Sequence, residues 1–213
     1  MFENRRDAGQ KLGKALSAYR GTGAFVLAIP RGGVPIGYEV ARVLDAELSL
    51  IITRKLPYPD NPESGFGAIA EDGSIFIYEQ AARSLAPETI RRIKAAQRDE
   101  IRRRITELRG GRSLPEIAGR TVILVDDGIA MGSTMRASVA LCKNRGAGEI
   151  IVAVPVAGRR AIREIREIVD EMIVLESPPA FRAVAQVYEH WYDVPDREVL
   201  EIMDAWKRED REV

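Results

Sequence analysis

Two adjacent aspartates, Asp126 and Asp127, follow a run of four apolar residues in the stretch TVILVDDGIAMGST (121–134). Neighbouring carboxylates repel each other, so such a pair indicates a ligand that needs two acceptors. The vicinal hydroxyls of a sugar meet that need, whereas capping the next helix would need only one aspartate. The small residues that follow, closed by Gly-Ser-Thr, leave the backbone open to a phosphate. The pattern therefore predicts a site for a ribose 5-phosphate.

Other phosphate-binding loops do not explain this stretch. The sequence contains no G-x-x-x-x-G-K-[ST] loop, and no G-x-G-x-x-G follows an apolar run. The expected phosphate site is instead the first turn of a helix that begins near Gly132. Free N–H groups and the helix dipole attract anions there.

Five short apolar runs are the expected strands, and segments with helical periodicity separate them. The runs are Phe25–Pro30, Glu47–Thr53, Thr121–Val125, Ile150–Val156 and Met172–Glu176. Apolar strands joined by helices predict an α/β fold, an open parallel sheet covered by helices on both faces. Ligands bind to such sheets at the carboxyl ends of the strands, which is where the aspartate pair lies.

Two segments interrupt this alternation within one expected domain, residues 1–213. Residues 56–73 contain three prolines and three glycines and predict a flexible loop, with a hairpin turn near Asp72-Gly73. Residues 80–118 indicate a helical insertion, whose main helix runs from Glu88 to Arg109. The C-terminal stretch VPDREVLEIMDAWKRED predicts an amphipathic helix, which we expect to form a small hood with the N-terminal segment.

The composition of the chain restricts the class of protein. The 213 residues are 46% hydrophobic and carry 32 basic and 32 acidic side chains, so zero net charge makes nucleic acid an improbable partner. No apolar run is long enough to cross a bilayer, and the N-terminus lacks a secretory signal. The single cysteine, Cys142, fits the reducing cytoplasm. The single histidine, His190, belongs to no metal-binding cluster.

The stretch VILVDDGIAMGST resembles the phosphoribosyl-pyrophosphate (PRPP) binding motif of the type I phosphoribosyltransferases. That motif consists of a hydrophobic strand, two acidic residues, two mostly apolar residues and a small-residue loop that ends in Gly-x-Thr. The resemblance implies the fold of that family over roughly residues 24 to 176. It also implies that Asp126 and Asp127 hold the ribose 2- and 3-hydroxyls.

The same resemblance implies a cradle for the 5-phosphate. Its members would be Ala130, Met131, Gly132, Ser133 and Thr134. Two residues depart from the usual motif. Gly128 stands where a branched apolar residue is usual, and Met131 replaces a threonine or serine, which removes one hydroxyl from the cradle.

Two further loops of the family have counterparts in this chain. The pyrophosphate loop after the first core strand corresponds to AIPRGGVPIG, where Arg31 would pair with phosphate oxygens and Gly32 and Gly33 would allow close approach. The family often has a non-proline cis peptide in this loop, which we expect between Arg31 and Gly32. A mobile catalytic loop opening with basic residues corresponds to ITRKLPYPDNPESGFGAIAEDG, with Arg54 and Lys55 at its start.

The reaction implied by the resemblance is attack of a nitrogen nucleophile on C1 of PRPP with loss of pyrophosphate, as in nucleotide salvage. The positive charge that develops on the ribose would favour nearby carboxylates, and Arg31, Arg54 and Lys55 would hold the leaving group. The implied cofactor is Mg²⁺, held mainly by PRPP and not directly by the protein. The expected partners are PRPP and a small nitrogenous acceptor, and the expected assembly is a homodimer.

Two residues concern the acceptor. Family members that act on 6-oxopurines typically carry an aspartate three residues after the second acidic residue, and this chain has Ala130 there. Because alanine cannot exchange a proton, 6-oxopurines are disfavoured as acceptors. Phe181, after the last expected strand, could stack on the acceptor ring or belong to the core.

A competing hypothesis is a PRPP-sensing regulator with the same fold, which would bind RNA through the helix Glu88 to Arg109. Such a protein would keep the phosphate cradle and lose the residues that handle the leaving group. The basic residues of PRGG and RK favour the enzyme.

Overall fold

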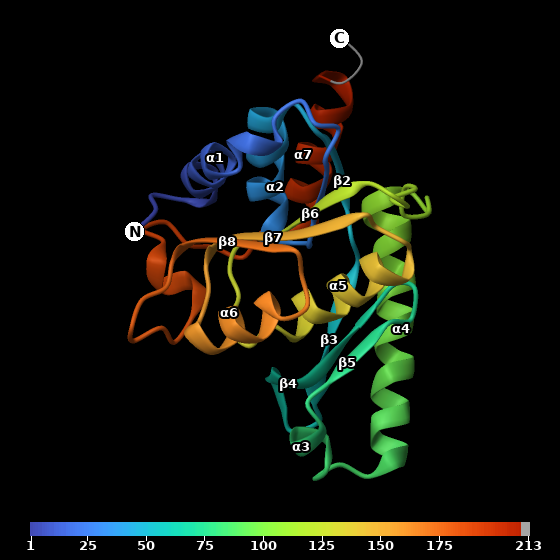
Figure 1. Ribbon diagram of the computed structural model, residues 1–213. Coiled ribbons are helices and arrows are strands. Elements are labelled where there is room, and N and C mark those ends of the chain that lie inside the picture. The colour runs from blue at the N-terminus through green and yellow to red at the C-terminus, as the bar shows by residue number, and fades with distance from the viewer. Residues whose placement is uncertain (210–213) are drawn as a thin grey trace.

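The computed structural model describes residues 1–209 and contains two sheets with helices around them (Figure 1). The elements are α1 (Arg5–Ala15), η1 (Ser17–Tyr19), β1 (Phe25–Ala28), α2 (Gly33–Leu44), β2 (Glu47–Leu50), β3 (Thr53–Tyr58), β4 (Asn61–Ala70), β5 (Ile75–Ile77), α3 (Glu79–Ala82), α4 (Pro87–Arg109), β6 (Thr121–Val125), α5 (Ser133–Asn144), β7 (Glu149–Val156), α6 (Arg159–Arg166), β8 (Glu171–Glu176), η2 (Val184–Val187) and α7 (Asp196–Glu209).

The larger sheet is the predicted open parallel sheet. Its strand order is β2-β1-β6-β7-β8, and all four pairings are parallel. Helices α1, α2 and α7 lie on one face and α5 and α6 on the other, as Figure 1 shows. Alternate residues of β1 serve the two layers, because Val26 packs into the first and Leu27 into the second. The α/β prediction with helices on both faces is confirmed.

The smaller sheet includes residues 56–73, for which the sequence predicted a flexible loop, and it gives this segment regular structure. Strands β3, β4 and β5 pair antiparallel in that order and form what we call the antiparallel lobe (residues 53–77). The prolines had suggested an irregular segment, but the pairing register shifts on either side of Pro57, and β3 is an edge strand that tolerates proline. Leu56, Phe66 and Ile69 are fully buried and hold the strands together. The hairpin turn expected near Asp72-Gly73 joins β4 to β5.

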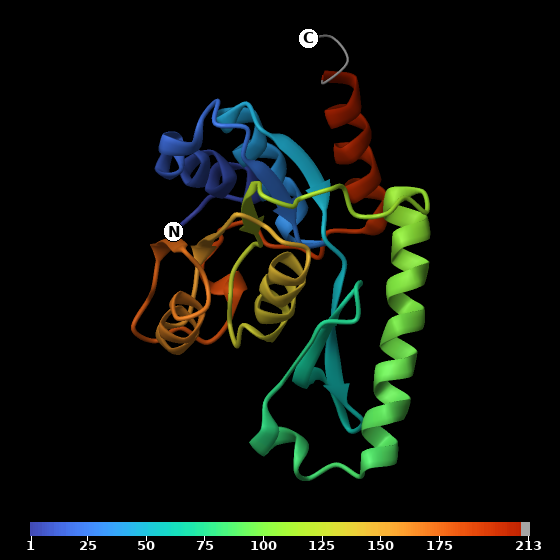
Figure 2. The ribbon, with the colours of Figure 1, turned by 45° about the vertical axis from the view of Figure 1, so that its right-hand side comes forward.

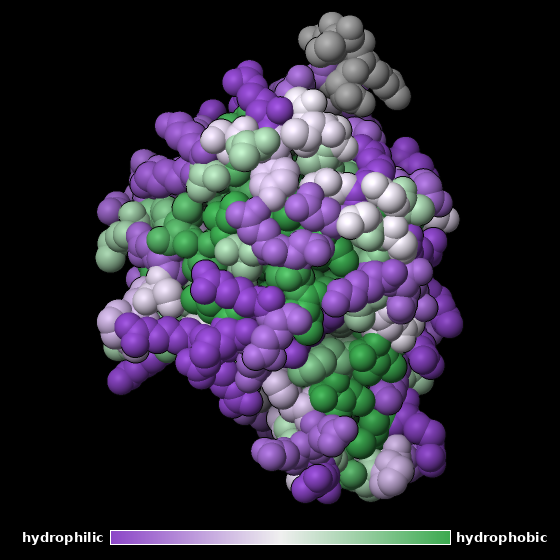
Figure 3. Space-filling model, in the orientation of Figure 1, coloured by the Kyte–Doolittle hydropathy of each residue, from purple (hydrophilic) through white to green (hydrophobic). Residues whose placement is uncertain are grey.

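The surface of the antiparallel lobe is partly apolar. In the space-filling view apolar side chains reach the surface of the lobe, with hydrophilic side chains around them (Figure 3). The three residues of β5, the second edge strand of this sheet, are accordingly only half-buried. The lobe is thus less completely covered than the larger sheet, whose central strands are buried on both faces.

Helix α4 runs beside the antiparallel lobe along its whole length (Figure 2). It begins at Pro87 and ends at Arg109, and the following Gly110 caps it with a φ of 61°, in the left-handed region. The buried Arg109 at its end forms an ion pair with Glu71 of the β4–β5 turn and donates to the carbonyl of Leu50 at 3.0 Å. The inserted helix is therefore attached to both sheets.

The N-terminal arm and the segment after β8 are held together by backbone hydrogen bonds. Phe2 N donates to the Val187 carbonyl at 2.7 Å, and His190 N donates to the Glu3 carbonyl at 2.9 Å. We call residues 1–5 and 187–192 the terminal clasp. Helix α7 packs on α2, where Tyr38 and Trp206 meet edge to face. Of the helices within residues 1–209, none is both long and apolar enough to cross a membrane.

Candidate active site

The site is built around the carboxyl end of β6. Asp126 and Asp127 follow this strand directly, and the backbone N–H of Asp127 donates to Asp126 Oδ1 at 2.8 Å. Asp127 is also held by a residue from far along the chain, because Arg5 Nη2 and Nε lie 2.9 and 3.0 Å from Asp127 Oδ2. The two aspartates are therefore adjacent in sequence but differ in their partners.

This difference separates the two carboxyl groups electrostatically. Burial raises the pKa of Asp126 well above its ordinary value, and the charge of Asp127 raises it further. Burial also raises the pKa of Asp127, but the guanidinium of Arg5 opposes that rise. When the pair holds one proton, Asp126 therefore carries it more readily than Asp127.

Arg5 was missed by the sequence reasoning. Its side chain is 4% exposed although it is charged, and its only acidic partner within residues 1–209 is Asp127. The available signal was its spacing, because Arg5, Ala8 and Leu12 lie at i, i+3 and i+7 and share the buried face of α1. That spacing shows that Arg5 faces inward, but not which carboxylate it meets.

The expected phosphate cradle lies at the start of α5. Gly132 has a φ of 82° and precedes the first helical residue, Ser133, as the sequence predicted for a helix that begins there. The side chain of Met131 is 59% exposed, so it does not fill the loop. A Cβ on Gly128 would lie 2.7 Å from side-chain atoms of Val156 and Val184. Packing thus accounts for glycine where the family motif usually has a branched residue.

The loop after β1 lies directly against the aspartate pair. A Cβ on Gly32 would lie 1.8 Å from Asp127 Oδ2, and one on Gly33 would lie 2.8 Å from the Val125 carbonyl. Neither glycine has a positive φ. Glycine is therefore required at these positions by the close approach of neighbouring atoms and not by unusual dihedral angles. The cis peptide lies between Pro30 and Arg31, one bond earlier than expected. Neither bond precedes a proline, so no local rule distinguished them.

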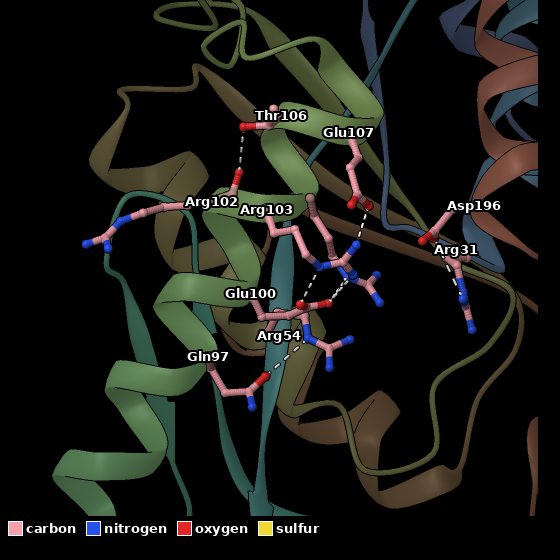
Figure 4. Close-up of polar contacts among 10 residues, drawn as sticks. Arg31, Arg54, Gln97, Glu100, Arg102, Arg103, Thr106, Glu107 and Asp196 are labelled. Atoms are coloured by element: carbon pink, nitrogen blue, oxygen red, sulfur yellow. Dashed lines mark hydrogen bonds and ion pairs between the residues drawn. The ribbon is translucent and has the colours of Figure 1, made fainter.

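Arg54 of β3 and Arg103 of α4 lie on the side of this loop where Arg31 projects (Figure 4). Arg54 of β3 donates to Gln97 of α4 at 3.2 Å and forms no ion pair with a carboxylate that the structure describes. Burial lowers the pKa of its guanidinium, and the nearby charges of Arg104 and Arg31 lower it further. Arg31 reaches only 3.7 Å from Asp196. Glu100 lies near enough to oppose the lowering of the Arg54 pKa. A half-buried cation such as Arg54, which forms no direct ion pair among the described residues, is suited to binding an anion.

A cavity of about 1070 Å³ opens between the β6–α5 loop and the antiparallel lobe. The β6–α5 loop lines it with Asp126 and residues 128–135, so every member of the expected phosphate cradle faces the cavity. The lobe and the chain after it contribute Lys55, Tyr58, Ser64, Gly65 and residues 77–81, and Arg160 and Val184 complete the lining.

Other predicted site residues do not line this cavity. Asp127, Arg31, Gly32, Gly33 and Arg54 lie outside its wall. Phe181 is also absent from the wall, and its ring lies beside Gly158 and packs on the larger core. The cavity therefore gives no support to Phe181 as the acceptor-binding residue.

Side chains that could ligate a metal are not clustered in the described part of the chain. Among the side chains that the structure describes, which exclude Glu63 and residues 210–213, no group of three His, Cys, Asp or Glu could hold a metal ion. Cys142 and His190 lie apart from the site, the first buried and the second exposed.

Comparison with known proteins gives consistent results. A family model described as "Phosphoribosyl transferase domain" matches residues 3–190. The crystal structure of TT1426 from Thermus thermophilus is 36% identical, with a TM-score of 0.80 over 96% of this chain and 98% of that chain. A Staphylococcus aureus hypoxanthine phosphoribosyltransferase, only 12% identical, shares the fold with a TM-score of 0.50 over 82% of this chain and 75% of that one.

A curated relative from Mycobacterium tuberculosis (strain ATCC 25618 / H37Rv) carries the name "Putative phosphoribosyl transferase Rv0571c". It is 35% identical over 211 residues, which cover 98% of this chain and 48% of the relative. The chain thus spans about half the length of the curated relative it matches.

Proposed function

Because the chain belongs to the phosphoribosyl transferase domain family, we propose that it transfers the 5-phosphoribosyl group of PRPP to a nitrogen of a small acceptor and releases pyrophosphate. The observation that carries this proposal is the aspartate pair at the end of β6, followed closely by the left-handed Gly132 that opens α5. PRPP has ribose hydroxyls that the aspartate pair can bind and a 5-phosphate that the start of α5 can bind.

In the proposed reaction the aspartates bind the ribose hydroxyls and stabilise positive charge on the ring. The bond from C1 to the pyrophosphate oxygen breaks as the acceptor nitrogen attacks, so C1 acquires cationic character in the transition state. Asp126 lines the cavity and Asp127 lies directly behind it. The carboxylate form of each group is the useful one. Binding of the sugar should therefore lower the pKa of Asp126, which burial raises in the free protein.

The 5-phosphate would be bound by backbone N–H groups at the start of α5 and by the hydroxyls of Ser133 and Thr134. The pyrophosphate would face Arg31 and Arg54, with Lys55 contributing from the cavity wall. Mg²⁺ bound to PRPP would neutralise phosphate charge. Since Mg²⁺ commonly keeps phosphate and water ligands, a protein cage is not required.

The test is a screen of nucleobases and related amines with PRPP and Mg²⁺, in which pyrophosphate release is measured. Asp126→Asn combined with Asp127→Asn should abolish release. Unchanged release in this double variant would remove the ribose assignment. PRPP binding without release for any acceptor would instead favour the sensing protein.

The leaving-group assignment has its own control. Arg54→Gln should weaken inhibition by pyrophosphate at least tenfold, because a charge-assisted hydrogen bond contributes about 1.5–3 kcal/mol. Arg102→Gln is the control, because the side chain of Arg102 on α4 is 75% exposed. This substitution should leave inhibition by pyrophosphate unchanged. Equal effects of the two substitutions would indicate a general charge effect and not a binding site.

A further inference from the structure

Arg5 is held in one orientation by three hydrogen bonds beneath the aspartate pair. Two of them, from Nε and Nη2, go to the same oxygen, Asp127 Oδ2. The third goes from Nη1 to the carbonyl of Tyr192 at 2.8 Å. Because the planar guanidinium is bound to Asp127 on one side and to Tyr192 on another, it cannot turn without losing at least one of these bonds.

Aromatic rings of the terminal clasp cover this guanidinium. The ring centroid of Trp191 lies 3.9 Å from Arg5 Cζ, within the range of a cation–π contact, and Tyr192 lies at 5.5 Å. The Tyr188 hydroxyl donates to the backbone carbonyl of Asp127 at 2.7 Å. The clasp therefore holds Asp127 through both its side chain and its backbone.

These contacts leave the two carboxylate oxygens of Asp127 in different situations. Oδ2 accepts both bonds from Arg5 and lies on the side where Gly32 leaves no room for a Cβ. Oδ1 takes no part in the bonds to Arg5 and is not among the buried atoms that lack a partner. Oδ1 is thus the oxygen that remains for a ligand.

We propose that Arg5 is a positioning residue, which fixes Asp127 so that Oδ1 is presented to a hydroxyl of the ribose in the proposed reaction. This inference rests on the proposed function, because the ligand of Oδ1 is the sugar assigned there. Arg5 itself does not touch the substrate. It acts through Asp127, and it belongs to the N-terminal helix α1 and not to the PRPP motif.

The charge of Arg5 gives the inference a second, measurable consequence. The charged and titratable groups around Asp127 are Arg5 on α1, Asp126 beside it and Tyr188 in the clasp, with Glu176 of β8 beyond the tyrosine. Of these groups Arg5 is the only cation, and its charge and hydrogen bonds favour the carboxylate form of Asp127 more than the hydrogen bond with Asp126 does. Removing its charge should raise the pKa of Asp127, so PRPP binding should be lost at a higher pH as the solution is acidified.

Orientation and charge can be separated by two substitutions. Arg5→Gln removes both the charge and the paired geometry. Arg5→Lys keeps the charge but cannot donate two parallel bonds from a planar group. Arg6→Gln is the matched control, because Arg6 is the next residue of α1, its side chain is 71% exposed and its partner is Glu39.

The experiment is titration calorimetry of PRPP with Mg²⁺ between pH 5 and 8, using the full chain. Arg5→Gln should weaken binding at least tenfold at pH 7 and shift the acidic limb of the profile to higher pH. Arg5→Lys should restore the position of the limb but not the full affinity. Arg6→Gln should behave as the unsubstituted protein.

The outcomes distinguish this inference from the proposed function. If the unsubstituted protein does not bind PRPP, the proposed function fails. If it binds PRPP and Arg5→Gln has the same affinity and pH profile, the positioning role is wrong. Tighter binding by Arg5→Gln would mean that Arg5 blocks the site, which also overturns the role.

A measurement without ligand covers the case in which Arg5→Gln does not fold. Carbon-13 NMR of aspartate-labelled protein follows the carboxyl groups directly. In Arg5→Lys the pKa of Asp127 should stay close to its value in the unsubstituted protein, while the carboxyl chemical shift should move because the paired geometry is lost. An unchanged shift would show that Arg5 does not orient this carboxylate.

Discussion

Asp126 and Asp127 are both acidic, but only Asp127 has a cation within hydrogen-bonding distance in the part of the chain that the structure describes. The sequence alone predicts that neutralising two crowded charges leaves the fold intact or slightly more stable. The contact with the buried Arg5 changes that expectation for Asp127, because its loss leaves a guanidinium in the interior without a counter-charge. For Asp126 the expectation stands, since burial and its neighbour both disfavour its charge.

Single substitutions should therefore have opposite effects at pH 7. Asp127→Asn should lower the free energy of unfolding by about 1.5–3 kcal/mol, the range for a hydrogen bond to a charged group. Asp126→Asn should leave it unchanged or raise it. Chemical denaturation of the two variants measures both values, and a larger loss for Asp126→Asn would contradict the assigned pairing.

The same asymmetry predicts a pH dependence. The pKa of Asp126 is raised in the folded protein, so between its ordinary value near 3.8 and the raised value the folded state keeps a proton that the unfolded state has lost. Rising pH through this window must then reduce stability, by at most about 1.4 kcal/mol per pH unit. Asp126→Asn should flatten this part of the stability profile. An equally steep profile in the variant would assign the slope to another group.

Ala130 leads to a prediction about the acceptor. It lines the cavity, and its neighbours Ile129 and Met131 have no ionisable group. A positioned acid or base contributes roughly a hundred- to ten-thousand-fold in rate. We therefore expect kcat/KM for hypoxanthine, guanine and xanthine to lie well below that for adenine, uracil or another acceptor.

Glu176, the last residue of β8, is the control for this prediction, because a carboxylate at the end of another strand of the same sheet could accept the proton that Ala130 cannot. If a 6-oxopurine is the best acceptor by an order of magnitude or more, the interpretation of Ala130 is wrong. Glu176→Gln would then show whether that side chain supplies the proton acceptor.

At the scale of elements, the sequence predicted features formed by contiguous residues and missed contacts between residues far apart in the chain. The strands of the larger sheet were predictable because each is a short apolar run, and the β6–α5 loop was predictable because its site residues are contiguous. The Arg5–Asp127 pair was not, since 122 residues separate its partners. The antiparallel lobe was taken for a loop because the segment contains three prolines and three glycines, residues that are uncommon inside strands.

The lobe now predicts a more restricted motion than a loop would. Phe66 and Ile69 are fully buried, and Tyr78, just after β5, donates to the carbonyl of Met131 in the β6–α5 loop. Tyr58, Ser64 and Gly65 nearer the tip line the cavity. Closure over a ligand should therefore involve the tip and not the base of the lobe.

Hydrogen exchange should resolve the two parts. Residues 66–70 should exchange slowly with or without ligand, because they are buried and paired on both sides. Residues 58–64 should exchange quickly in the free protein and become protected when PRPP and an acceptor bind. Equal protection of residues 58–64 in both states would argue against a closing tip. Fast exchange of residues 66–70 in the free protein would support the flexible loop predicted from the sequence.

At the scale of the whole molecule, distant parts of the chain meet behind the aspartate pair. The terminal clasp joins residues 1–5 to residues 187–192, and Tyr188 in it reaches the backbone of Asp127. Phe2 is 2% exposed and its ring lies 5.7 Å from that of Tyr188. The N-terminal arm is thus part of the support of the site although it does not line the cavity. The expected homodimer remains a prediction.

This arrangement predicts that damage to the clasp reaches the site. Phe2→Ala should remove up to about 3–5 kcal/mol of stability if the arm unfolds with the core, and less if the arm opens alone. In either case Tyr188 and Arg5 lose their packing, so PRPP affinity should fall together with the protection of residues 187–192 from hydrogen exchange.

Leu12→Ala is the matched control. Leu12 is fully buried on the same helix as Arg5 and packs into the same core as Phe2, but it lies outside the terminal clasp. Its truncation should lower stability by about 2–5 kcal/mol and leave PRPP affinity unchanged in the folded protein. Calorimetric titration well below the melting temperature compares the two variants. Equal losses of affinity would mean that the site responds to general stability, whereas a loss confined to Phe2→Ala would show that the clasp positions Asp127.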